Sequence, residues 1–135
     1  MGKLKKQGVN RGTRIQAKQD DSKPATFEHP VFCFRMIQNG FGLEDCSNED
    51  AANFGRALQR ISQLKWNSWY QAPRKGMGLE KIRHNALKVP IPKVINDDIT
   101  FQSARFGAKK SFIGYRSGYV FRVLWIDRDF KCYDH

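Results

Sequence analysis

Three apolar segments in the last third of the chain constrain the fold more than any other feature of the sequence. Residues 99–105, 111–116 and 119–126 are rich in β-branched and aromatic residues, and a glycine or an acidic turn follows each of them. Ser117 and Gly118 suit a two-residue hairpin loop, which sets Ile113 opposite Arg122. A further segment, residues 130–134, follows a turn at 127–129. This pattern predicts an antiparallel sheet.

The first half of the chain adds a helical section. Ser47 is an N-cap candidate with Asp50 at the capping-box position, and apolar residues then recur at helical spacing. These residues are Ala51, Phe54, Leu58, Ile61 and Leu64. We expect a helix over residues 48–65, a strand over 31–37 and a shorter helix near 78–87. The chain is therefore predicted to be α+β, with the helical section packed on a twisted antiparallel sheet of four to five strands.

The net charge of the chain indicates the class of its partner. Lys and Arg together number 24 against 13 Asp and Glu, which gives a formal net charge of +11. Such an excess attracts polyanions, so nucleic acid is the expected partner. No segment pairs a cationic face with a large apolar face, and no apolar run approaches transmembrane length. We therefore expect no membrane partner.

Residues 1–26 are predicted to form a disordered basic arm, separate from a single α+β domain over residues 27–135. The arm carries seven Lys and Arg against two Asp, and few large apolar residues. It cannot bury enough apolar surface to offset the entropy lost on ordering. Two roles fit its charge equally well: contact with phosphates through counterion release, or a solubilising tail.

The cysteines and histidines predict neither a metal centre nor a disulfide framework. Cys33, Cys46 and Cys132 form no C-x-x-C pair, and the three histidines are equally dispersed. The basic start of the chain lacks the apolar stretch of a signal peptide. We therefore expect a cytoplasmic location and no metal or other cofactor.

The loop after the third segment decides which polar side chains share one face of the sheet. A two-residue loop at 128–129 sets His135 opposite Arg122, with Tyr133 on the same face. Arg122, Tyr133 and His135 are then candidate catalytic residues, because a metal-free ribonuclease needs proton-transfer groups and a cation beside the phosphate. A three-residue loop over 127–129 instead sets Asp134 opposite Arg122 as a partly buried salt bridge. The sequence leaves both registers open.

Cations are dense between residues 74 and 116, where ten Lys and Arg face three acidic residues. Arg binds phosphate oxygens through its bidentate fork and Lys acts as a point charge. The candidate RNA-binding residues are Lys81, Arg83, Arg105, Lys109, Lys110, Arg116 and Lys131. Trp66, Trp69 and Tyr70 border this stretch, and we expect them to pack in the core rather than to stack on bases.

The order of the elements and the C-terminal residues resemble the RelE/ParE-like superfamily of bacterial toxins. Residues 119–127 read as an aromatic residue, Arg122, an aliphatic run and an acidic turn, and residues 131–135 carry Tyr133 and His135, similar to YoeB-like members. The resemblance implies a RelE-like fold, with a helical hairpin packed on a twisted antiparallel sheet.

It also implies a metal-independent endoribonuclease toxin of a toxin–antitoxin system. Such a toxin acts on messenger RNA, free or on the ribosome, and has an acidic antitoxin as its partner. Two alternatives stand beside this interpretation: a non-catalytic basic RNA- or ribosome-binding protein, and a ParE-like topoisomerase inhibitor.

The net charge generates a first prediction, which concerns the salt dependence of binding. We expect the affinity for nucleic acid to fall steeply with salt, because each neutralised phosphate adds about −0.9 to the log–log slope on duplex DNA and less on single strands. Titrations at a series of KCl concentrations measure this slope. An affinity that does not change between low and high salt would contradict the electrostatic argument.

Overall fold

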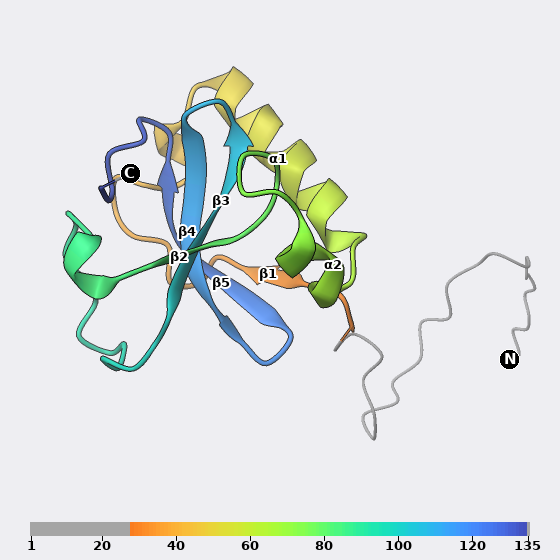
Figure 1. Cartoon of the computed structure of the whole chain (residues 1–135). Helices are drawn as coiled ribbons and strands as arrows, with labels where there is room; N and C mark the ends of the chain where they lie inside the picture. The colour runs from red at the N-terminus through yellow and green to blue at the C-terminus, as the bar shows by residue number, and fades with distance from the viewer. Residues whose placement is uncertain (1–27, 135) are drawn as a thin grey trace, which may run out of the picture.

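The computed structural model describes residues 28–134. The predicted basic arm and His135 lie outside the described residues. Within them the chain is α+β, and a five-stranded sheet has the strand order β1-β5-β4-β3-β2 (Figure 1).

The sheet is mixed rather than purely antiparallel. β3 (Phe101–Gly107), β4 (Lys110–Ser117) and β5 (Val120–Asp127) form the predicted meander. β2 (Glu80–Ile82) pairs antiparallel with β3 at one edge, whereas β1 (Val31–Cys33) pairs parallel with β5 at the other. The prediction of an antiparallel sheet is therefore wrong for β1, because the long helical connection allows the chain to return in the same direction.

Both helices lie on one face of the sheet (Figure 1). α1 (Asn48–Ser62) begins as the sequence predicts, because the Ser47 hydroxyl accepts a hydrogen bond from the backbone N–H of Asp50 at 3.0 Å. Its apolar stripe buries Phe54, Ala57 and Ile61 against β3, β4 and β5. α2 (Trp66–Gln71) is a separate helix, and its Trp66 and Trp69 enter the same core.

Loops cover the opposite face of the sheet. Strand residues that include Phe101, Ile113 and Trp125 form a second apolar core on this face. Side chains from the loop after β1, from the connection between β2 and β3, and from the C-terminal segment pack against it. The sheet is therefore buried on both faces, which explains why its central strands read as almost continuous apolar runs.

Two predicted elements are wrong. Residues 78–87 form β2 and a 3-10 turn at His84–Ala86 instead of a helix. Residues 130–134 form no strand beside β5, and only Tyr133 makes an isolated antiparallel bridge, to Leu87. The fifth strand of the sheet is therefore β2, at the edge opposite β1, and not the C-terminal segment. The first strand is also shorter than the predicted 31–37, since it ends at Cys33.

The predicted register between β4 and β5 is wrong as well. The turn lies at Gly118 and Tyr119, where glycine has a φ of 66°, and not at Ser117 and Gly118. As a result Arg122 pairs with Tyr115, and not with Ile113.

A β-bulge between β4 and β5 adds one residue to β5. Gly114 pairs with Val123 and Ile113 pairs with Trp125, so Leu124 is the extra residue. A Cβ atom at position 114 would overlap the carbonyl oxygen of Arg122. Glycine is thus needed here for the close approach of two backbones.

We predict that Gly114→Ala destabilises the protein by roughly 2 kcal/mol or more, because the bulge must open to admit the methyl group. The control is Gly55→Ala, since this helical glycine has no atom within 4 Å of a Cβ. That change should stabilise the protein by about 0.5–1 kcal/mol. Urea unfolding measures both values, and equal stability of the two variants would contradict the role of Gly114.

Candidate functional site

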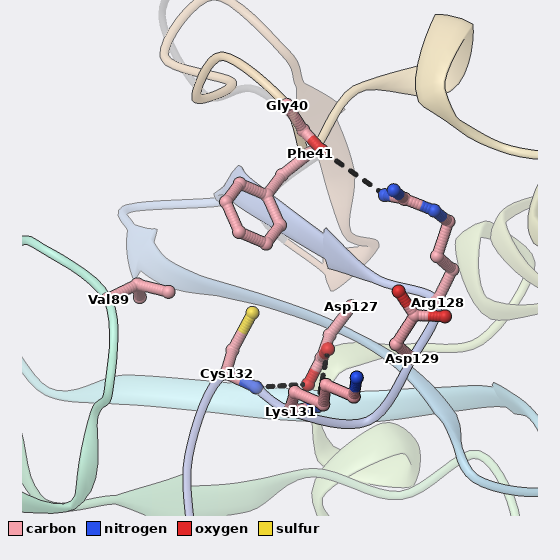
Figure 2. Close-up of a pocket in the computed structure, with 8 residues that line it drawn as sticks. All are labelled: Gly40, Phe41, Val89, Asp127, Arg128, Asp129, Lys131 and Cys132. Atoms are coloured by element: carbon pink, nitrogen blue, oxygen red, sulfur yellow. Dashed lines mark hydrogen bonds between the residues drawn. The ribbon is translucent and has the colours of Figure 1, made fainter.

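A buried carboxylate directs the C-terminal segment away from β5. Asp127 is 2% exposed, and its two carboxylate oxygens accept the backbone N–H groups of Lys131 at 2.8 Å and Cys132 at 2.9 Å (Figure 2). Beyond this turn, Lys88 N–H donates to the Cys132 carbonyl at 2.7 Å, and Asp134 N–H donates to the Ala86 carbonyl at 3.1 Å. These bonds bring Tyr133 to the connection after β2.

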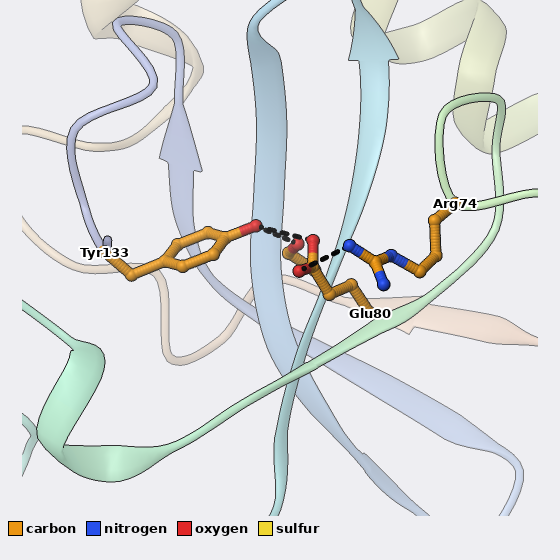
Figure 3. A network of polar contacts seen from close by, with 4 residues as sticks. Arg74, Glu80 and Tyr133 are labelled. Carbon is orange, nitrogen blue, oxygen red and sulfur yellow. Dashed lines mark hydrogen bonds and ion pairs between the residues drawn. The ribbon is translucent and has the colours of Figure 1, made fainter. Parts of the chain in front are cut away.

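The Tyr133 hydroxyl is the centre of a polar network at the β2 edge of the sheet (Figure 3). It lies 2.8 Å from the Ser103 hydroxyl and donates to the Glu80 carboxylate at 3.3 Å. The other carboxylate oxygen of Glu80 lies 3.2 Å from the Arg74 guanidinium. A phenol, a carboxylate and a guanidinium therefore meet in one hydrogen-bonded group.

Burial keeps the Tyr133 phenol protonated. The side chain is 4% exposed, and loss of hydration together with the negative charge of Glu80 raises its pKa to about 12, although the hydrogen bond to Ser103 acts in the opposite direction. Tyr133 is thus a hydrogen-bond donor at neutral pH.

Arg105 adds a second cation near this network. It lies on β3 two residues after Ser103, so both side chains are on the same face. Its guanidinium carbon is 5.1 Å from the centre of the Phe130 ring, and its charge slightly opposes the rise in the pKa of Tyr133. The network accordingly combines a proton acceptor with cations suited to phosphate.

The structure separates Arg122 from Tyr133, two of the predicted catalytic residues. Arg122 lies on β5, where its guanidinium donates to the Cys33 sulfur at 3.5 Å, whereas Tyr133 contacts β2 and β3 on the other side of β4. His135 lies outside the described residues. The register that placed Arg122 opposite His135 required a terminal strand that does not form. The catalytic roles of these three residues stay predictions.

Sequence reasoning missed Glu80 and Arg74 as partners of Tyr133. Glu80 and Tyr133 are 53 residues apart, and the three-residue strand β2 has no alternation that marks it as part of a sheet. One signal was available: an acidic residue within a basic stretch must find a cation or a polar partner.

The predicted RNA-binding residues are divided among several surfaces. Lys81 and Arg116 are exposed and line the same groove. Arg105 is half-buried against Phe130, and Lys110 is half-buried in an ion pair with Asp50 at 3.0 Å. The remaining three are exposed outside that groove: Arg83 after β2, Lys109 in the β3–β4 turn and Lys131 in the C-terminal segment.

The described residues lack both a metal-binding cluster and a membrane-spanning helix. Residues 28–134 contain no group of three or more His, Cys, Asp and Glu side chains placed to hold a metal ion. Among the same residues, neither helix has the length and apolar character required to cross a membrane.

No protein-family model matches the chain, and comparisons with curated proteins and with solved structures give no significant match either.

The environment of Tyr133 predicts an unusual titration. The difference in tyrosinate absorbance between the wild type and Tyr133→Phe should rise with a midpoint near pH 12, and not near the ordinary value of 10. Because folding raises this pKa, the stability contributed by the phenol is complete below about pH 10 and is lost as the pH rises to about 12. A difference curve with its midpoint near pH 10 would show that Tyr133 is solvated.

Proposed function

We propose that the protein is a metal-independent endoribonuclease toxin that acts on messenger RNA and is neutralised by an acidic antitoxin. The observation that carries this proposal is the network of Tyr133, Glu80 and Arg74, in which a carboxylate is oriented between a phenol and a guanidinium. The side chain of Glu80 is 32% exposed and that of Arg74 is 70% exposed, so RNA can reach both.

In the proposed reaction, Glu80 takes the proton from the 2′-hydroxyl of the RNA. The resulting oxygen attacks the adjacent phosphorus, the bond from phosphorus to the 5′-oxygen breaks, and this leaving oxygen receives a proton from His135. The products are a 2′,3′-cyclic phosphate and a 5′-hydroxyl. Arg74 and Arg105 stabilise the charge that develops on the phosphate oxygens. Tyr133 is a positioning residue, because it holds Glu80 without exchanging its own proton.

The assignment of the phosphate-binding role differs from the one based on sequence. Arg122 faces Cys33 and Tyr115, whereas Arg74 and Arg105 flank the Glu80 network. We therefore keep Arg105 as a phosphate-binding residue, as the sequence predicts, and give Arg74 the role that the sequence pattern had given to Arg122.

A non-catalytic RNA- or ribosome-binding protein is the second candidate. The burial of Tyr133 at 4% exposure favours it, because a closed network that only joins the C-terminal segment to β2 and β3 needs no reaction. The two candidates differ in what the loss of Glu80 changes: RNA cleavage in the first, and at most stability in the second.

We predict that Glu80→Gln and His135→Ala each lower RNA cleavage by roughly 10²–10⁴-fold while RNA binding is retained, as expected for the loss of a general base or acid. Expression of each variant followed by transcript-end mapping measures cleavage in the cell. Glu44→Gln is the matched control, since Glu44 is an exposed acid of the 3-10 turn Leu43–Asp45, outside the network.

A thermal melt of each purified variant separates lost chemistry from lost folding. Folded Glu80→Gln that cuts transcripts as efficiently as Glu44→Gln would eliminate Glu80 as the base. Tyr133→Phe should have a smaller effect than Glu80→Gln, because it removes an orienting hydrogen bond and leaves the base in place.

A further inference from the structure

The helical face of the sheet carries a groove that the ribonuclease proposal does not use. Its volume is about 740 Å³, and Tyr70, Lys81, Asp98, Gln102 and Arg116 line it together with Ile99, Thr100 and Gly118. Gln102 is next to Ser103 on β3, so the groove and the Tyr133 network lie on opposite faces of the same strand. β2 likewise directs Lys81 and Glu80 to opposite faces.

Tyr70 is the exposed aromatic residue of α2. Trp66 and Trp69 are 3% and 0% exposed, whereas Tyr70 is 42% exposed and borders the groove. The expectation that all three pack in the core is therefore wrong for Tyr70. Burial of the two tryptophans fixes the helix that presents the tyrosine ring, so the ring is held at the groove by a rigid element.

Arg116 is held in a fixed position beside Tyr70. Its guanidinium carbon lies 3.9 Å from the centre of the Trp66 ring and 5.7 Å from that of Tyr70. The same side chain donates to the Gly118 carbonyl at 2.6 Å and to the Tyr70 hydroxyl at 3.3 Å. Since no ion pair of the described residues involves Arg116, its charge is available to an anion.

The other polar residues of the groove complete a site for a nucleotide. Lys81 is an exposed cation that takes no part in the ion pairs within residues 28–134. Gln102 is 5% exposed and contributes an amide at the wall of the groove. Asp98 is the one acid among the lining residues, and a carboxylate accepts hydrogen bonds from the amino group of a base.

We propose that this groove binds one nucleotide of single-stranded RNA, with the base stacked on Tyr70 and the phosphate held between Arg116 and Lys81. The choice of RNA as the ligand rests on the proposed function. An aromatic ring beside two cations supplies the two interactions that single strands need, stacking and phosphate neutralisation. A duplex hides the faces of its bases, so it cannot stack on Tyr70.

The test is fluorescence anisotropy with a labelled single-stranded 2′-O-methyl RNA, which cannot be cleaved because the attacking hydroxyl is blocked. Tyr70→Ala should weaken binding by about tenfold or more, whereas Tyr70→Phe keeps the ring face and should stay within about threefold of the wild type. Lys81→Ala should weaken binding more than Lys93→Ala, which removes the same charge from an exposed position outside the groove. Thermal melts confirm that each variant is folded.

The same oligonucleotide annealed to its complement is the second arm of the test. We expect Tyr70→Ala to change binding of the duplex by less than about threefold, since only diffuse charge contributes there. Unchanged single-strand binding by Tyr70→Ala, equal losses in the two lysine variants, or preferential binding of the duplex would each overturn the assignment. Cleavage plays no part in this assay. If the protein binds single-stranded RNA as predicted here but cuts no RNA, only the ribonuclease proposal is refuted.

Discussion

The buried carboxylate of Asp127 determines where the end of the chain goes. By accepting two backbone N–H groups, from Lys131 and Cys132, it ends β5 in a tight turn and prevents the return strand that a simple hairpin would make. On the loop-covered face of the sheet, the segment then pairs with Ala86 and Leu87, which follow β2. Charge-assisted bonds of this kind are strong when they are shielded from water. Together with the backbone bonds to Ala86 and Lys88, they hold the segment so that Tyr133 contacts Glu80 on β2.

The edge strand β2 relates the two proposed sites to each other. Glu80 faces the Tyr133 network and Lys81 faces the groove beside Tyr70, although they are consecutive residues. A flexible single strand that crosses this edge contacts both faces, whereas a stiff duplex does not. The two proposed sites lie on different faces of the sheet: Glu80, the proposed base, is on the loop-covered face, and Tyr70, Lys81 and Arg116 are on the helical face.

Local patterns in the sequence predicted those elements whose own residues specify them. The Ser47 cap and the spacing of Phe54 and Ile61 were sufficient for α1, and the apolar runs were sufficient for the three long strands. The parallel pairing of β1 and the existence of β2 were not predictable, because strands of three residues depend on their neighbours.

The bulge at Leu124 shows why a candidate site is harder to predict than a fold. One additional residue moves every later side chain of β5 relative to β4, and only the close approach at Gly114 marks its position.

The measurement that tests the central claim most directly is cleavage of a 5′-labelled single-stranded RNA by the purified protein. The free RNA is assayed in excess EDTA, and the RNA on ribosomes is assayed in the Mg²⁺ that ribosomes need. The account predicts fragments that end in a 2′,3′-cyclic phosphate. Intact RNA under both conditions, or cleavage that requires a divalent metal, would contradict it.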